Sequence, residues 1–160
     1  MDVKKKYLIR RSLDFYSELE FAKFLEKKGY LVFYPFRDVG IDMMSYKNGK
    51  IELYQLKSRN EHVRYPNIYW FPIRKKDIIK LEEYSRFFDV FFVLCALQTN
   101  GKFDFFKIPL NVVKQYIRLR EKTTKKRDAH FLEIKRISER NYEIKPERIR
   151  KQININNYLL

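Results

Sequence analysis

The chain has 160 residues, of which 45% are hydrophobic and 17% aromatic, and a chain of this size can form a single domain with one core. The longest apolar run, residues 90–97, is far too short to span a bilayer. The N-terminal segment lacks the apolar stretch and the cleavage site of a secretion signal. Cys95 is the only cysteine, which excludes an internal disulfide and a cysteine-based zinc cluster. We therefore expect an intracellular protein without a membrane span.

The charge of the chain points to a polyanionic partner. Thirty-five Lys and Arg residues against twenty Asp and Glu give a formal net charge of +15 at pH 7. An excess of this size in a small domain favours nucleic acid as the partner, and a solvated basic surface is the alternative. The basic residues are spread along the chain rather than gathered on one amphipathic segment, so we expect no membrane contact. The four glycines stand singly, so the sequence has no glycine-rich phosphate-cradling loop, and we expect no use of nucleoside triphosphates.

The N-terminal part predicts a helix followed by a strand. The helix is expected over residues 12–28, with Ser12 as its N-cap and Gly29 directly after its end. An apolar strand over residues 30–34 follows the glycine.

A hairpin comes next. Residues 41–46 and 51–57 flank Asn48-Gly49, one of the strongest short-range hairpin signals because a type I′ turn needs positive φ at both central positions. We expect a two-residue turn here.

The rest of the chain predicts a mixture of strands and helices. In chain order we expect a loop over 58–66, a strand over 68–73, a helix over 74–88, a buried strand over 89–97, a strand over 103–108, a helix over 109–119, and a small hairpin over 131–137 and 141–146. This order predicts an α/β or α+β fold with a mixed central sheet flanked by helices. Residues 1–119 would form the core, and residues 120–160 a basic C-terminal extension that packs on it.

The hairpin predicts a cluster of polar side chains near its open end. In a two-residue turn, paired residue numbers sum to 97, so Asp42 faces Gln55, and Lys57 points the same way. The Asp42 carboxylate, the Gln55 amide oxygen and the Leu56 backbone carbonyl are oxygen ligands of the kind that Mg²⁺ prefers. Lys57 can orient a water molecule or neutralise developing charge. Glu18 lies on the inward face of the first helix, where a carboxylate needs a partner, and a metal site would supply one.

The same residues also allow a purely structural interpretation. Asp, Gln and Lys on one hairpin face are often a solvated strand face. Glu18 would then form an ion pair with Lys57 or Arg11.

The order of these residues resembles the core of the PD-(D/E)xK nuclease superfamily. A helix-borne Glu18, then Asp42, an Asn-Gly turn and Gln55-x-Lys57 follow the pattern, most closely that of archaeal Holliday junction resolvases, over roughly residues 8–113. The resemblance implies a restriction-endonuclease-like fold and a homodimeric, Mg²⁺-dependent DNA endonuclease of recombination or repair, with Mn²⁺ able to substitute. Glu18, Asp42, Gln55 and the Leu56 carbonyl would hold the metal, and Lys57 would assist the attacking water.

Two departures from the resolvase pattern leave alternatives open. Gln55 stands where resolvases have an acidic residue, although Gln-x-Lys also occurs in the Mrr-like endonucleases of the same superfamily. The segment between Gly29 and Asp42 lacks the longer mobile loop of resolvases. The alternatives are an Mrr-like restriction or homing-type endonuclease acting on duplex DNA, and a catalytically inactive nucleic-acid-binding protein.

Basic residues outside the cluster are candidate phosphate contacts. They are Arg37, then Arg59, His62 and Arg64 after Lys57, and Lys125, Lys126 and Arg127 in the charged connector. Residues 64–71, RYPNIYWF, mix aromatic and basic side chains and could stack bases, but we favour their interpretation as a core strand with its edge. A nucleoid-associated location follows if DNA is the partner.

Overall fold

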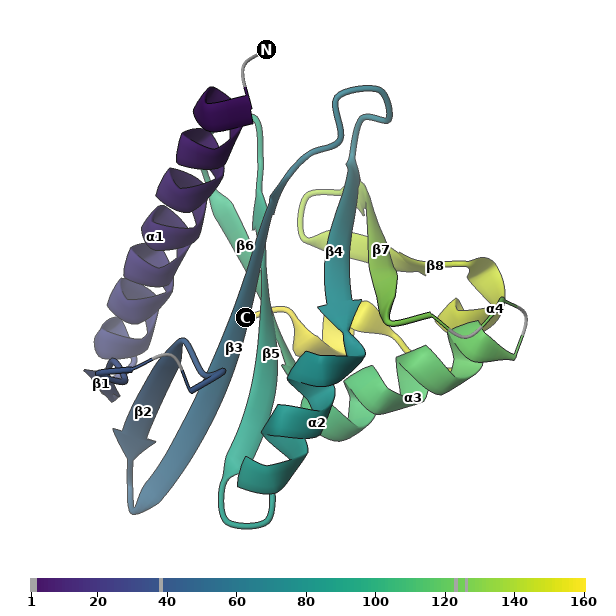
Figure 1. Ribbon diagram of the computed structural model, residues 1–160. Coiled ribbons are helices and arrows are strands. Elements are labelled where there is room, and N and C mark those ends of the chain that lie inside the picture. The colour runs from purple at the N-terminus through teal and green to yellow at the C-terminus, as the bar shows by residue number, and fades with distance from the viewer. Residues whose placement is uncertain (1–2, 38, 123, 126) are drawn as a thin grey trace.

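The computed structural model describes residues 3–160 apart from 38, 123 and 126, with side chains from residue 12 onward. Its elements, drawn in Figure 1, are α1 (Val3–Lys27), β1 (Leu31–Phe33), β2 (Met43–Lys47), β3 (Lys50–Asn60), β4 (Ile68–Arg74), α2 (Lys75–Tyr84), β5 (Asp89–Leu97), β6 (Phe103–Pro109), α3 (Leu110–Glu121), β7 (Ala129–Ser138), β8 (Asn141–Lys145), α4 (Glu147–Arg150) and a 3₁₀ turn, η1 (Ile155–Tyr158).

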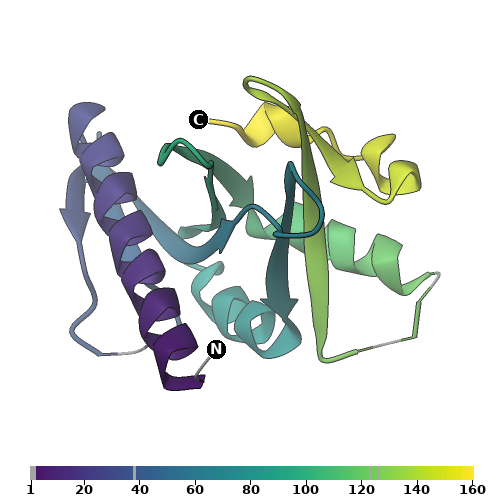
Figure 2. The ribbon, with the colours of Figure 1, turned by 90° about the horizontal axis from the view of Figure 1, so that it is seen from above.

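A five-stranded mixed sheet forms the centre of the molecule. Its strand order is β1-β2-β3-β5-β6, with β3 and β5 parallel and the other neighbours antiparallel. A second, three-stranded antiparallel sheet has the order β4-β7-β8. Figure 2 shows α1 along one side of the central sheet and the second sheet on the other. The expected fold class, a mixed central sheet flanked by helices, is therefore confirmed.

Two hydrophobic cores lie on the two faces of the central sheet. The smaller core packs α1 against the face that carries Met43, Tyr54, Leu56, Val93 and Cys95. The larger core joins the other face to α2, α3 and the second sheet. Alternate residues of β3 therefore enter different cores.

Helix α1 begins earlier than the sequence predicted. It starts at Val3 rather than at residue 12, so Ser12 lies inside the helix and the N-cap prediction is wrong. The preceding residues contain no glycine or proline and are rich in Lys and Arg, which extend a helix readily. The predicted end is confirmed: Gly29 has φ +82°, and its N–H donates to the Glu26 carbonyl at 2.9 Å.

The predicted hairpin and its register are confirmed. Asn48 and Gly49 have φ of +51° and +80°, and Met43 pairs with Tyr54, as a two-residue turn requires. Strand β3 continues to Asn60, three residues into the predicted loop, because it pairs with β5 along this whole length.

The C-terminal segment is built into the larger core. The hairpin β7–β8 forms as predicted, and β7 pairs with β4. Its buried residues Leu132, Ile134, Tyr142 and Ile144 share that core with α3.

Helix α2 is shorter than predicted and ends at Tyr84. Its apolar stripe, Ile78 and Leu81, is already buried, whereas Phe87 beyond the helix end is 79% exposed.

Among the described residues, no helix combines the length and the hydropathy needed to cross a bilayer.

Candidate active site

The predicted polar residues gather along the edge of β3 that extends beyond its pairing with β2. Strand β2 begins at Met43, which pairs with Tyr54, while β3 runs on to Asn60. A hollow of about 240 Å³ lies along this edge, lined by Asp14, Glu18, Asp42, Gln55, Leu56, Lys57, Ser58, Arg59, Pro72 and Arg74. One hollow between α1, β3 and β4 is therefore lined by all the predicted site residues: Glu18, Asp42, Gln55, Leu56 and Lys57.

A bulge sets the position of Asp42. Its N–H donates to the Tyr54 carbonyl at 2.9 Å, although Tyr54 already pairs with Met43, so two consecutive residues oppose one. Gly40, two residues before Asp42, has φ +79°, a backbone conformation that favours glycine at this approach to the site. The direct backbone pairing of Asp42 with Gln55 that the sequence predicted is therefore replaced by a bulge.

The bulge still brings the predicted side chains together. The Asp42 Oδ2 atom accepts a hydrogen bond from the Gln55 Nε2 and another, at 2.6 Å, from the Leu56 N–H. In a β-strand the N–H and C=O of one residue point to the same side, so the Leu56 carbonyl also points toward this edge. Gln55 is buried at 9% exposure.

Lys57 is held by a residue that the sequence analysis missed. Its Nζ lies 2.9 Å from the Asp77 Oδ2, and both side chains are 18% exposed. Asp77 lies in the first turn of α2, where a carboxylate is favourable. The alternative pairing of Glu18 with Lys57 is thus replaced by a Lys57–Asp77 pair, and the side chain of Arg11 lies outside the described part of the chain.

Helix α1 is fixed to β3 next to the hollow. The Ser17 and Ser58 hydroxyls are both buried and hydrogen-bonded to each other, and the Ser17 hydroxyl also donates to the Asp14 carbonyl at 2.8 Å. This contact places the next residue, Glu18, at the edge of β3. Nothing in the sequence marks the serine pair beyond the small size of the two side chains.

The environment of Glu18 disfavours its charged form. Burial, followed by the nearby charges of Asp42 and Asp14, raises the pKa of Glu18 from 4.5 to about 7. Asp14 precedes Glu18 by one helical turn, and this spacing was the signal that could have included it.

These donors fit a hard divalent cation. The carboxylates of Asp42 and Glu18, the Gln55 amide and the Leu56 carbonyl all offer oxygen ligands. Burial is the largest cause of the raised pKa of Glu18, and the charges of Asp42 and Asp14 add to it. Within the described ranges, no three His, Cys, Asp or Glu side chains are arranged as a metal cluster. Any cation would therefore depend on the amide and carbonyl oxygens as well as on carboxylates.

The predicted DNA contacts are distributed over several places. Arg59 lines the hollow, and its Nη1 donates to the Ser58 carbonyl. Arg64 and His62 lie in the loop between β3 and β4, and the His62 Nδ1 accepts the N–H groups of Arg64 and Tyr65 at 3.1 and 3.2 Å. The exposed predicted contacts elsewhere are Arg37, Lys125 and Arg127, and Lys126 lies outside the described residues.

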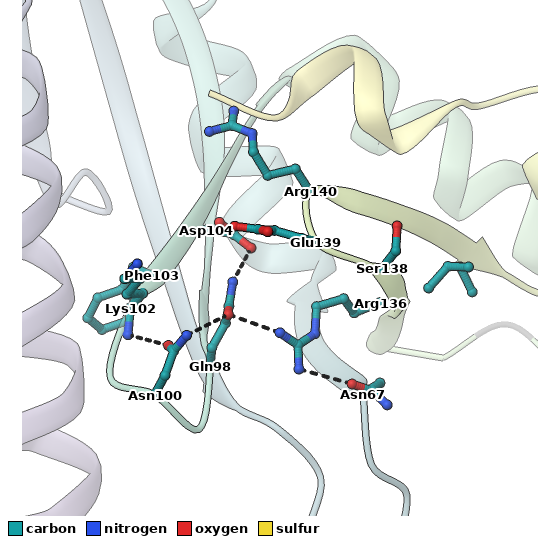
Figure 3. A pocket seen from close by; sticks show the side chains of 11 residues that line it. Asn67, Gln98, Asn100, Lys102, Phe103, Asp104, Arg136, Ser138, Glu139 and Arg140 are labelled. Atoms are coloured by element: carbon teal, nitrogen blue, oxygen red, sulfur yellow. Dashed lines mark hydrogen bonds between the residues drawn. The ribbon is translucent and has the colours of Figure 1, made fainter.

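A second polar hollow, of about 670 Å³, lies where β5 and β6 meet the β7–β8 turn (Figure 3). Its side chains bond to one another. Arg136 donates to the Gln98 Oε1 at 2.9 Å and to the Asn67 Oδ1 at 3.0 Å, and Gln98 donates to Asp104 at 2.7 Å. The network fastens Asn67, at the end of the β3–β4 loop, to β7.

Comparisons by sequence find no match. No known protein family matches the chain, and no curated protein resembles it. Among solved structures, it is similar to a Holliday junction resolvase from Archaeoglobus fulgidus, an archaeal hyperthermophile, with a TM-score of 0.48 and 12% sequence identity over 74% of this chain and 80% of that one. A likeness of this size assigns no function, and the fold class rests on the sheets and helices described above.

Proposed function

We propose that the chain is a divalent-metal-dependent DNA endonuclease, most similar in character to the structure-selective resolvases whose motif it resembles. The observation that carries the proposal is the single hollow lined by Glu18, Asp42, Gln55 and Lys57. At this edge of β3, two carboxylates and an amide offer oxygen ligands to a divalent metal. The Lys57 ammonium offers a positive charge to a phosphate group that the metal would bind. The net charge of +15 favours a polyanionic substrate.

Asp42, Gln55, Glu18 and the Leu56 carbonyl would hold Mg²⁺, or Mn²⁺ in its place. The bound metal would polarise the phosphate and lower the pKa of a water molecule. The Leu56 N–H and the Gln55 amide hold the Asp42 carboxylate in position. Glu18, with a pKa of about 7 in the cation-free site, gains or loses a proton near neutral pH.

Lys57 would assist the attack of water on the phosphate. Its ammonium is held at the hollow by Asp77, and a fixed positive charge stabilises the negative charge that develops on the phosphate. Arg59 and Arg74 line the same hollow and would contact the flanking phosphates. A nucleoid-associated location is part of the proposal, because the substrate is DNA.

A homodimer is also part of the proposal, because two strands of a junction must be cut. An exposed apolar stripe crosses β1, β2 and β3 at the far end of the sheet: Leu31 pairs with Tyr46, which pairs with Ile51, at exposures of 60, 42 and 43%. Contiguous exposed apolar groups favour association. A second copy would cover this stripe.

Cleavage of matched substrates tests the proposal. Four-way junction, linear duplex and single-stranded DNA of the same sequence are incubated with Mg²⁺ or Mn²⁺, using the wild type and Asp42→Ala. Symmetric cutting of the junction by the wild type alone supports resolvase-like activity, whereas equal cutting of junction and duplex supports the Mrr-like alternative. If both proteins bind DNA equally and neither cuts any substrate, the chain is a nucleic-acid-binding protein and the proposal is wrong.

A further inference from the structure

An aromatic hollow lies next to the candidate active site. It has a volume of about 810 Å³, within the range of small-molecule sites. The rings of His62, Tyr65 and Trp70 gather in it, with centroids 5.0 Å apart for His62–Tyr65, 4.3 Å for His62–Trp70 and 6.0 Å for Tyr65–Trp70. Arg59, Arg64 and Phe131 also line it. The side chains of Tyr65 and Phe131 are 52 and 54% exposed, so they are not part of the hydrophobic core and are open to a ligand.

Strand β4 divides its aromatic residues between the core and this hollow. Tyr69, Phe71 and Ile73 are completely buried, which confirms the predicted core strand for one face. Trp70, Pro72 and Arg74 form the other face because side chains alternate along a strand. Trp70 lines the aromatic hollow, while Pro72 and Arg74 line the candidate active site.

The aromatic hollow and the candidate active site lie next to each other along both β3 and β4. Arg59 of β3 lines both of them. Along β4, Trp70 and Arg74 are four residues apart, about 13 Å at the rise of a strand, or about four base-pair steps of duplex DNA. A nucleic-acid strand in the active site would therefore place a nearby nucleotide at the aromatic rings.

The loop that carries His62 and Tyr65 is held in place by hydrogen bonds within the loop and to β7. The His62 N–H donates to the Ile68 carbonyl at 2.8 Å, and the His62 Nδ1 accepts the N–H groups of two following residues. The Glu61 carboxylate accepts the Asn67 N–H, and Arg136 binds Asn67 from β7 (Figure 3). A stacking surface that is already ordered loses little conformational entropy on binding.

We infer that this aromatic hollow binds an unpaired nucleobase of the DNA substrate, within about four nucleotides of the phosphate at the active site. The inference rests on the proposed function for the identity of the substrate. Aromatic rings stack on any base, and Arg59 and Arg64 complement the phosphates on either side. Bases in a perfect duplex are already stacked and paired, so the hollow selects DNA with unpaired nucleotides next to the cleavage site.

The only tryptophan of the chain reports directly on this site. A single-stranded oligonucleotide and an abasic strand of equal length and charge are titrated into the metal-free protein in EDTA, and Trp70 fluorescence is recorded together with the anisotropy of a labelled strand. We expect the base-containing strand to bind roughly 5- to 150-fold more tightly, as stacking of one base predicts, and to quench Trp70. Equal affinities, or binding without a change in Trp70 fluorescence, would overturn the inference.

Two substitutions of Tyr65 separate stacking from a structural effect. Tyr65→Ala should remove most of the preference for the base-containing strand and leave the affinity for the abasic strand unchanged, whereas Tyr65→Phe should keep the preference. Phe87→Ala, at an aromatic residue that is more exposed than Tyr65 and lies outside the hollow, is the control and should behave as the wild type. Equal loss of affinity for both strands in Tyr65→Ala would refute a base-binding site.

The binding assay is independent of nuclease activity, because it contains no divalent metal. A protein that cuts DNA but fails this assay retains the proposed function and lacks the base site. A protein that passes it but cuts nothing retains the base site and lacks the nuclease activity.

Discussion

Replacing Glu18 by Gln should stabilise the metal-free protein at alkaline pH. The pKa of Glu18 is raised from 4.5 to about 7 by burial and by the charges of Asp42 and Asp14. Each pKa unit corresponds to about 1.4 kcal/mol, so the full difference would be about 3.5 kcal/mol. Solvent screening at this half-buried side chain reduces the value, and we expect a gain of about 1–2 kcal/mol in the free energy of unfolding at pH 8.

The pH dependence of this gain has a definite sign. Between about pH 4.5 and 7, Glu18 is ionised in the unfolded chain and protonated in the folded one, so the folded state binds more protons and wild-type stability falls as pH rises. Above pH 7 the carboxylate is charged in both states and the full cost applies. Glu18→Gln carries no such proton, so its advantage should grow from pH 4.5 to 7 and then level off.

Urea unfolding in EDTA at several pH values measures the effect. Glu26→Gln, the same chemical change on an exposed part of the same helix, is the control for helix propensity. Adding Mg²⁺ should stabilise the wild type, by about 2.7 kcal/mol at one hundred times its dissociation constant, and should stabilise Glu18→Gln less. An advantage that is independent of pH, or equal stabilisation of both proteins by Mg²⁺, would refute the assignment of Glu18 to a cation site.

Three further predictions concern the metal ligands, the lysine and the dimer. Gln55→Glu should lower metal-free stability by about 1–2 kcal/mol in urea unfolding, because the amide donor to Asp42 becomes a second negative charge. The same substitution should reduce the Mg²⁺ concentration needed for half-maximal cleavage about tenfold in a Mg²⁺ titration. Lys57→Met should lower the cleavage rate by at least about a hundredfold, whereas Asp77→Asn, which only releases the lysine, should lower it less; equal losses in single-turnover assays would contradict these roles. If the proposed dimer forms through the apolar stripe across β1, β2 and β3, Tyr46→Lys should convert it to a monomer in light scattering with chromatography, and an unchanged dimer mass would exclude the stripe as the interface.

The order of elements along the chain followed from local signals in the sequence. Asn48-Gly49 determined the turn and, through it, the register of β2 and β3, because positive φ is available to few residues. Gly29 ended α1 for the same reason. A continuous apolar run predicted β5, and apolar periodicity predicted α3. Glu18, Asp42, Gln55 and Lys57 were singled out from the turn register, the inward face of the first helix and the resemblance of their order to a nuclease motif.

Tertiary structure decided how those residues meet. A bulge at Asp42, rather than the ladder expected from the turn, lets its carboxylate accept the Leu56 N–H. Asp77 reaches Lys57 from α2, which begins at Lys75, eighteen residues after Lys57 in the sequence. The pairing of β4 with β7 brings together segments more than fifty residues apart, and no local pattern encodes it.

The sequence by itself therefore determined which side chains carry the candidate chemistry, because residue type and local backbone preference are properties of short segments. The tertiary structure alone decided their surroundings: the uncovered edge of β3, the raised pKa of Glu18 and the aromatic hollow beside them. Burial and charge at a site depend on groups that only folding brings together.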